Sequence, residues 1–164
     1  MSKRIILCGP TCSGKNFVRE KFNQRGYTHD VSYTSREPRS EEIDGIDYRF
    51  ISKEEFLDRI EKKLFYEHVE YDGNYYGTGL TEWYKFDIFI METSGITHIS
   101  NDDRKESLVI YVNTPLNIRI HRMRERGWKR ERIIERIDVD NKKFDEFWDY
   151  DLQISSCRDD ERQD

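Results

Sequence analysis

The stretch Gly9-Pro10-Thr11-Cys12-Ser13-Gly14-Lys15-Asn16 decides how this chain folds. An apolar run, residues 5–8, precedes it, and residues 17–22, which have helical spacing, follow it. Strand, glycine loop and helix in this order are the context of a phosphate-binding loop. The two glycines allow a tight turn that points several backbone N–H groups toward one place, and the helix start adds its positive dipole end. The sequence therefore predicts a phosphate site, with Lys15 reaching the outer phosphates.

Asn16 occupies the position after the lysine, where loops of this kind usually carry Ser or Thr. The hydroxyl of Ser or Thr binds magnesium there, and an amide oxygen can also ligate magnesium, directly or through water. Asn16 is therefore the predicted metal-binding residue. Its longer side chain requires a different geometry.

Length and composition predict one domain with a modest core and a heavily charged surface. The chain has 164 residues, of which 35% are hydrophobic and 37% charged, and an average domain has about 25% charged residues. The net charge of -5 does not indicate nucleic-acid binding. No apolar run approaches the roughly 20 residues that span a membrane. An odd number of cysteines, 3, and no signal peptide predict a cytoplasmic protein.

Strands alternate with helices along the chain, which predicts a parallel sheet with helices on both faces. Strands are expected at 3–8, 27–33, 65–71, 75–78, 87–91, 108–112 and 151–154, and a hairpin at 43–50 around an Asp-Gly turn. A first helix is expected at about 15–24. A second begins at a capping box, residues 52–55, runs to Leu64 and has Phe56, Leu57 and Ile60 on one face. A third begins at 117 and is interrupted at Gly127.

Two groups of arginines lie outside the glycine loop. Arg36 and Arg39 stand on either side of Pro38, which prevents a regular helix and holds them on an ordered loop. Residues 119–136 form a second basic run, and Gly127 provides a bend that suits a segment closing over a nucleotide. Solvent-exposed charge is the alternative interpretation for each arginine.

Four blocks, in the order in which they occur, resemble guanylate kinases, which transfer a phosphoryl group from ATP to GMP. They are 9–15, Ser32-Tyr33-Thr34-Ser35-Arg36-Glu37-Pro38-Arg39, Asp44-Gly45-Ile46-Asp47-Tyr48-Arg49-Phe50, and Glu67 through Gly73-Asn74-Tyr75-Tyr76-Gly77-Thr78. The resemblance covers most of residues 4–155. It implies an α/β fold, a P-loop three-layer parallel sheet core with an inserted NMP-binding β/α region and a basic helical lid. It also implies one domain over 1–164, with the core at about 1–31, 78–118 and 137–157, the NMP-binding region at about 32–77 and the lid at about 119–136.

The resemblance also implies roles for individual residues. The ATP phosphates are expected at Gly9, Pro10, Thr11, Cys12, Ser13, Gly14, Lys15 and Asn16. The acceptor nucleotide is expected to be held by Arg36, Arg39, Tyr48 and Tyr76 at its phosphate, by Ser32, Glu67 and Thr78 at the base, and by the neighbouring Glu92. The predicted catalytic charges are Lys15, Arg122, Arg126 and Arg136. Independently, guanine offers two adjacent donors that suit the two oxygens of Glu67, and adenine lacks this pair.

The implied activity is the ATP-dependent phosphorylation of GMP or dGMP with Mg2+, and ATP and GMP or dGMP are the expected partners, without nucleic acid or membrane. Two alternatives stay open. Asn16 and Ile90, which stands where many relatives carry an acid that helps to hold magnesium, motivate a catalytically weak or inactive module that binds nucleotide or protein. A kinase for a modified purine deoxynucleotide is the other alternative.

Overall fold

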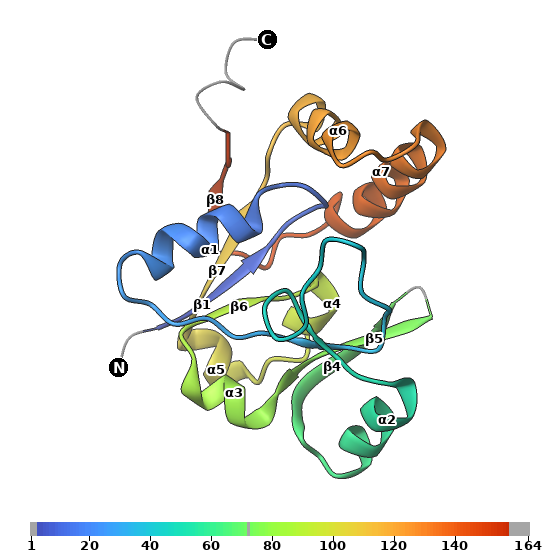
Figure 1. Cartoon of the computed structure of the whole chain (residues 1–164). Coiled ribbons are helices and arrows are strands. Elements are labelled where there is room, and N and C mark those ends of the chain that lie inside the picture. Colours follow the sequence, from blue (N-terminus) through green and yellow to red (C-terminus); the bar gives the residue numbers. More distant parts are fainter. Residues whose placement is uncertain (1–2, 72, 158–164) are drawn as a thin grey trace.

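The core of the fold is a four-stranded parallel sheet, which we call the core sheet, in a computed structural model that describes residues 3–71 and 73–157 (Figure 1). Its strand order is β6-β1-β7-β8, and every pair is parallel. The strands are β6 (Ile88–Ile90), β1 (Arg4–Cys8), β7 (Ser107–Val112) and β8 (Leu152–Ile154). β1, the strand that leads into the glycine loop, is therefore central, as predicted.

Alternate side chains of β1 enter two different apolar clusters, because successive residues of a strand point to opposite faces. Ile5 and Leu7 pack with Val18 of α1 (Lys15–Asn23). Ile6 and Cys8 pack with Trp83 of α3 (Leu80–Lys85), and with residues of α4 (Thr93–Ile96) and of the end of α7 (Arg130–Phe144). Helices thus cover both faces, and the predicted three-layer α/β fold is confirmed. A further short helix, α5 (Asn101–Lys105), precedes β7.

The second sheet has the strand order β3-β2-β5-β4, and it comes from the middle of the chain. Its strands are β2 (Tyr33–Thr34), β3 (Arg49–Phe50), β4 (Phe65–Tyr71) and β5 (Asn74–Gly79). α2 (Lys53–Glu61) begins at Ser52, whose side chain accepts the N–H of Glu55 at 3.1 Å. Phe56 of α2 is fully buried and stacks on Phe65, with ring centres 4.4 Å apart. This contact fixes α2 against the sheet.

Some sequence expectations differ from the structure. Residues 43–50 do not form a hairpin: Asp44 and Tyr48 make only an isolated parallel bridge, and β3 pairs in parallel with β2. The carboxylates of Asp44 and Asp47 accept the backbone N–H groups of Phe50 and Ile43, so side chains replace a strand ladder here.

Three further differences concern the extent of elements. Within 27–33 only Tyr33 belongs to a strand: His29 makes an isolated parallel bridge to Ile88, and the Asp87 carboxylate accepts the N–H of Thr28 at 2.8 Å. Leu57 and Leu64 of the expected apolar face near α2 are exposed, and only Phe56 is buried there. The short helices α3, α4 and α5 were not predicted at all.

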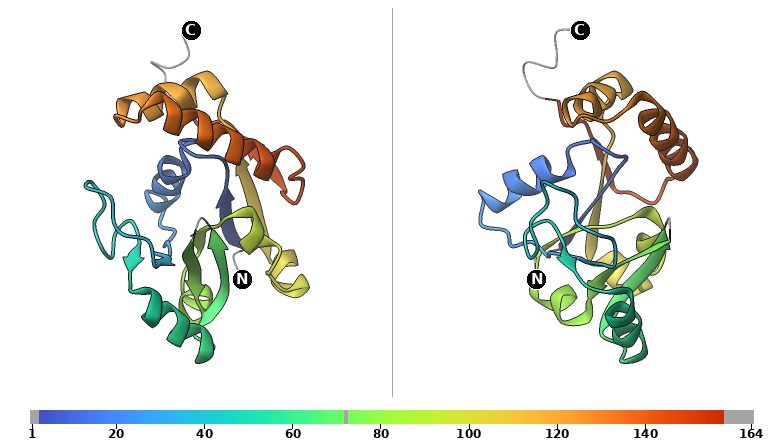
Figure 2. Two further views of the ribbon diagram at one scale, coloured as in Figure 1. Left: turned by 90° about the vertical axis from the view of Figure 1, so that its right-hand side faces the viewer. Right: turned by 45° about the vertical axis from the view of Figure 1, so that its right-hand side comes forward.

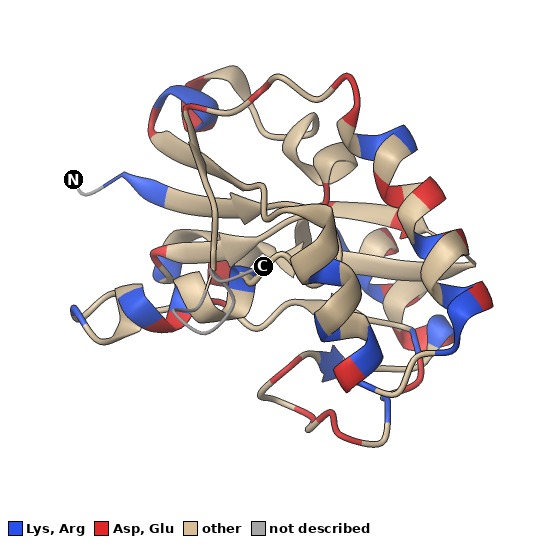
Figure 3. Cartoon of the chain, turned by 90° about the horizontal axis from the view of Figure 1, so that it is seen from above, with Lys and Arg blue, Asp and Glu red and all other residues tan. Residues whose placement is uncertain are grey.

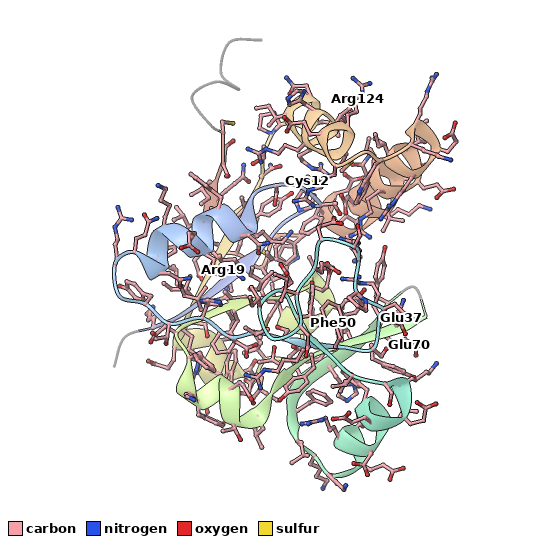
Figure 4. All side chains as sticks on the ribbon, in the orientation of Figure 1. Cys12, Arg19, Glu37, Phe50, Glu70 and Arg124 are labelled. Carbon is pink, nitrogen blue, oxygen red and sulfur yellow. The ribbon has the colours of Figure 1, made fainter. Side chains whose placement is uncertain are left out.

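The basic run forms two helices, α6 (Leu116–Glu125) and α7, which we call the lid helices. Gly127, with φ of +73°, separates them, and they lie side by side at one end of the molecule, with α2 at the other (Figure 2). Figure 3, which looks onto this end, shows basic and acidic residues interspersed along the helices. Met123 and Ile133 pack with Cys12 of the glycine loop. Cys12 is labelled in Figure 4. No helix within 3–71 and 73–157 has both the length and the apolar character needed to cross a membrane.

Candidate active site

The glycine loop connects β1 to α1 at the carboxyl end of the core sheet, and both its glycines are required by close contacts. A Cβ at Gly9 would clash with the carbonyl oxygen of Val112, and one at Gly14 would clash with the hydroxyl of Ser156. Both glycines also have positive φ, +153° and +95°. Gly14 is the N-cap of α1, so the free N–H groups of the first helical turn open toward the loop, as anion binding requires.

Lys15 lies back across the loop that precedes it. Its ammonium group donates to the carbonyl oxygens of Gly9 at 2.7 Å and Pro10 at 3.2 Å. Burial lowers the pKa of Lys15, while the carboxylates of Glu92 and Asp140 act in the opposite direction. A phosphate that entered the loop would offer Lys15 a charged partner in place of two neutral carbonyl groups.

A buried ion pair between the two lid helices holds Thr11, the third residue of the loop. Asp140 of α7 accepts the Thr11 N–H at 2.9 Å and its hydroxyl at 3.2 Å. Arg119 of α6 donates to the Thr11 carbonyl at 2.9 Å and to Asp140 at 2.5 Å. Both side chains are buried, with exposed fractions of 5% for Arg119 and 2% for Asp140. The lid helices therefore hold both the N–H and the carbonyl group of one loop residue, Thr11.

The three lid arginines that were predicted to be catalytic lie in different settings. Arg122 is buried and donates to the carbonyl oxygens of Cys12 at 3.0 Å and Ser156. Arg136 donates to the Thr11 hydroxyl, and to the Tyr71 hydroxyl at 3.0 Å. Arg126, the C-cap residue of α6, is exposed. The structure thus brings Arg122 and Arg136 to the glycine loop and leaves Arg126 at the surface.

The loop that carries Arg36 and Arg39 is organised by Glu42, which the sequence analysis missed. Arg36 makes two parallel hydrogen bonds of 2.9 Å to the two carboxylate oxygens of Glu42. Glu42 also accepts the backbone N–H of Arg39 at 2.8 Å. Burial by itself would raise the pKa of Glu42, but the hydrogen bonds from Arg36 and from the Arg39 N–H outweigh it, and the pKa is lowered overall. The guanidinium of Arg36 lies 5.5 Å from the Tyr48 ring centre, and Tyr48 lies 6.1 Å from Tyr76.

The loop that carries Arg36 and Arg39, which we call the arginine loop, contacts the lid helices. Its arginines and those of α6 and α7 therefore lie on the same side of the molecule. The guanidinium carbons of Arg39 and Arg132 lie 5.8 Å and 3.9 Å from the centre of the Trp128 ring.

Glu92, at the end of β6, pairs with Lys143 of α7 at 2.6 Å. Burial raises the pKa of Glu92, but Lys143 and, more weakly, Lys15 outweigh it and lower the pKa overall. Glu92 therefore lies in the field of the glycine-loop lysine.

Three residues were predicted to read a base. Glu67 and Thr78 lie opposite each other on β4 and β5 of the second sheet, and Ser32 directly precedes β2. Glu67 is 7% exposed, and one of its oxygens accepts the N–H of Thr78 at 3.1 Å and its hydroxyl at 2.8 Å. Burial raises the pKa of Glu67 to about 6. The second oxygen faces Gly95, where a Cβ would lie only 2.8 Å away. Ser32 donates its hydroxyl hydrogen to Asp30 at 3.2 Å.

The protein groups near the loop fit a magnesium ion that is held mainly by phosphate and water. Within 3–71 and 73–157 no three His, Cys, Asp or Glu side chains are grouped so that they could hold a metal by themselves. Magnesium commonly takes only one or two protein ligands when phosphates supply others. Asn16 is exposed in the first turn of α1. Ile90 packs against the apolar cluster under α1 and offers no ligand.

Comparison with known proteins agrees with this geometry. The guanylate kinase family matches residues 1–161. A guanylate kinase from Aster yellows witches'-broom phytoplasma (strain AYWB) is 33% identical over 151 residues, which are 85% of this chain and 72% of the relative. One from Onion yellows phytoplasma (strain OY-M) is 32% identical over 161 residues, covering 92% and 76%.

A solved structure shows the same fold. The crystal structure of guanylate kinase from Anaplasma phagocytophilum aligns with a TM-score of 0.71, over 94% of this chain and 77% of that chain, at 22% sequence identity. Because the family match covers nearly the whole sequence and two relatives exceed 30% identity over most of their length, the resemblance seen in the sequence is confirmed. This chain belongs to the guanylate kinase family.

Proposed function

We propose that this protein transfers the terminal phosphoryl group of ATP to GMP or dGMP and forms the diphosphate. The observation that carries the proposal is the convergence of two phosphate sites, because Arg39 of the arginine loop and Arg132 of α7 share Trp128 while Arg136 of the same helix contacts the glycine loop. The family membership and the relatives named guanylate kinase support it.

On the donor side, backbone N–H groups of the glycine loop and of the first turn of α1 surround the ATP phosphates, without Pro10, which has no N–H, and Thr11, whose N–H is donated to Asp140, and Lys15 adds a mobile charge. The loop is held in shape by Arg119 and Asp140, which bind both polar groups of the Thr11 backbone. A loop that is already fixed loses little conformational entropy when phosphate binds. In this proposal residues of about 119–136 act as the lid over ATP.

On the acceptor side, Arg36 and Arg39 hold the GMP phosphate, with Tyr48 and Tyr76 as neutral donors beside them. Glu42 keeps Arg36 in place by a bidentate ion pair, so the guanidinium is oriented before the phosphate arrives. Glu67 accepts the two adjacent donors of guanine, and Ser32, Thr78 and Glu92 complete the nucleotide site. In this proposal residues of about 32–77 form the acceptor region.

Phosphoryl transfer needs alignment of the two nucleotides and positive charge around the moving group. Lys15, Arg122 and Arg136 are at the glycine loop, and closure of the lid would bring in Arg126, which is exposed here. Mg2+, bound by Asn16 and phosphate oxygens, would neutralise charge on the phosphates. The three cysteines are free thiols, which supports the proposal of a cytoplasmic location.

A coupled assay of ATP consumption tests the proposal, with GMP, dGMP, AMP, CMP, UMP and dTMP as acceptors. We expect turnover with GMP or dGMP, and much less with the others. Lys15→Met should abolish it, and Lys62→Met, which removes an exposed lysine of an ion pair on α2, is the matched control. If purified folded protein turned over neither GMP nor dGMP, the proposed transfer would be rejected and a binding module would remain.

A further inference from the structure

The strand that carries Glu67 ends at a tyrosine that contacts the lid helices. Tyr71 is the last residue of β4, and its side chain meets two residues of α7. Its hydroxyl accepts a hydrogen bond from Nη1 of Arg136 at 3.0 Å, and the Nζ atom of Lys143 lies 3.6 Å from the centre of its ring. Arg136 and Lys143 are seven residues apart, so they project from the same face of α7, two turns apart. This tyrosine therefore joins the second sheet to the lid.

Tyr71 lies on the same face of β4 as the carboxylate that is proposed to read the base. Side chains of a strand alternate between its two faces, so Glu67, Val69 and Tyr71 share one face. Glu67 and Val69 are both buried, and the pairing of β4 with β5 continues without a shift from Glu67 to Tyr71. Groups on one paired strand keep a fixed relative position better than groups on a loop. A base held at Glu67 is therefore fixed relative to Tyr71.

Arg136, the lid residue that bonds to the tyrosine hydroxyl, is held at two of its three guanidinium nitrogens. Nε donates to the hydroxyl of Thr11 in the glycine loop, and Nη1 donates to Tyr71. A guanidinium group is planar and rigid, so bonds at two nitrogens fix both its position and its plane. The third nitrogen, Nη2, makes no hydrogen bond to any residue within 3–71 and 73–157. Its N–H groups are thus oriented in advance and are available to a phosphoryl oxygen.

A phenolic hydroxyl suits the task of orienting Arg136. It accepts the hydrogen bond without adding negative charge, whereas a second carboxylate beside Asp140, which lies 3.4 Å from Nε, would cancel the charge that a phosphate needs. The ring of Tyr71 has a different partner from its hydroxyl, since it lies against Lys143, whose ammonium group pairs with Glu92 at 2.6 Å. The roles of the hydroxyl and of the ring can therefore be separated by substitution.

We propose that Tyr71 is a positioning residue for phosphoryl transfer: its hydroxyl aims the Arg136 guanidinium at the moving phosphoryl group, and its place on β4 ties that orientation to the acceptor base. The inference rests on the proposed function, since it concerns the same reaction. Tyr71 acts through Arg136 and is not itself a catalytic residue. Because the orientation of a charge counts most where charge moves, in the transition state, loss of the hydroxyl lowers kcat and leaves both KM values nearly unchanged.

The test compares kcat and the KM values for ATP and GMP in the wild type and in Tyr71→Phe, which keeps the ring against Lys143 and removes only the hydroxyl. We expect kcat to fall by about tenfold or more, with both KM values within about twofold of the wild type. Tyr66→Phe is the matched control, because it removes the hydroxyl of another tyrosine of β4, which donates to Asp103 of α5 at 2.7 Å. Its kcat should equal that of the wild type, and urea unfolding should show both variants folded.

A double variant shows whether Tyr71 acts through Arg136. In an Arg136→Met background, Tyr71→Phe should lower kcat no further, because two residues that act through one interaction do not have additive effects. An unchanged kcat in Tyr71→Phe, an equal loss in Tyr66→Phe, or a loss that adds to that of Arg136→Met would overturn the inference and leave the kinase proposal intact. If the wild type turned over neither GMP nor dGMP, the kinase proposal itself would fail, and this inference would fall with it.

Discussion

Glu42 and Asp140 show how single acidic residues prepare this site for anions. Each is bonded to an arginine and to a backbone N–H, Glu42 in the arginine loop and Asp140 at the glycine loop. Such charge-assisted bonds fix direction as well as distance. In each of the two proposed phosphate sites, a carboxylate therefore orients an arginine and a backbone N–H.

At this scale we expect Arg39→Ala to weaken GMP binding by about 2 kcal/mol, since a charge-assisted hydrogen bond is worth about 1.5–3 kcal/mol. The KM for GMP should rise by about thirtyfold, with little change in the KM for ATP. Arg25→Ala, which removes a guanidinium that donates to the Lys21 carbonyl, is the control. An unchanged KM for GMP would remove Arg39 from the acceptor site.

Glu67→Gln tests the reading of the base. A glutamine offers one acceptor and one donor, so it cannot satisfy both guanine donors, and the N1–H or the 2-amino group loses its partner. The ratio of kcat/KM for GMP to that for AMP should fall by about a hundredfold, measured with both nucleotides in the coupled assay. Selectivity equal to that of the wild type would show that Glu67 does not read the base.

At the scale of elements, α6 and α7 also support the glycine loop, because they hold the Thr11 backbone and pack against Cys12. The buried pair of Arg119 and Asp140 joins the two helices and holds Thr11 between them. Cys12 packs with Met123 and Ile133 of the same helices. In the proposed function, movement of these helices would therefore be coupled to the loop proposed to bind ATP.

Asp140→Ala should therefore lower stability and ATP affinity together. It leaves Arg119 buried without its partner, which costs about 3–5 kcal/mol of the free energy of unfolding. Replacing both residues, Arg119→Met with Asp140→Leu, should recover stability but not the KM for ATP, because the backbone N–H and carbonyl of Thr11 lose their partners. Denaturant unfolding and steady-state kinetics measure the two quantities. If the double variant bound ATP as the wild type does, the pair would be structural only.

The sequence predicted the elements whose signals are local. β1, the glycine loop and α1 follow from one apolar run, two glycines and a lysine, and the four blocks shared with guanylate kinases identified the family. The failures are nonlocal or concern short pieces. The hairpin at 43–50 was wrong because Asp44 and Asp47 bond to backbone groups that a ladder would have used. α3, α4 and α5 are too short for a helical period to show.

The same limit applies to the site. The arginines were found as charges, but which of them are buried depends on partners far along the chain. Arg119 meets Thr11 and Arg122 meets Cys12 across more than a hundred residues. Asp140 carried one local signal, its place four residues after Arg136 on the same helical face, and Asp30 carried another, its place two residues before Ser32. Neither signal by itself indicates burial.

At the scale of the whole molecule, the buried carboxyl groups make the ligand-free protein sensitive to pH. The pKa of Glu67 is raised from 4.5 to about 6 in the folded state, so the folded protein keeps this proton to a higher pH than the unfolded chain. Stability from this group is present below about pH 4.5 and is lost as the pH rises through about 6.

We therefore expect the free energy of unfolding of the wild type, relative to that of Glu67→Gln, to fall by about 2 kcal/mol between about pH 4.5 and pH 7. The variant lacks this titration, and the comparison cancels the contributions of the histidines and of the other acids. Urea unfolding at a series of pH values measures it. A difference that stayed constant with pH would show that folding does not raise the pKa of Glu67.

The proposed transfer requires two phosphate sites that face each other across a distance that polyphosphate can bridge. The most direct test is calorimetry with adenosine and guanosine joined through their 5′ positions by five phosphates, compared with ATP and GMP alone. We predict one molecule bound per chain, at least about a hundredfold more tightly than GMP, because the second contact becomes intramolecular. Binding no tighter than that of the better single nucleotide, with the other nucleotide still able to bind, would contradict the account.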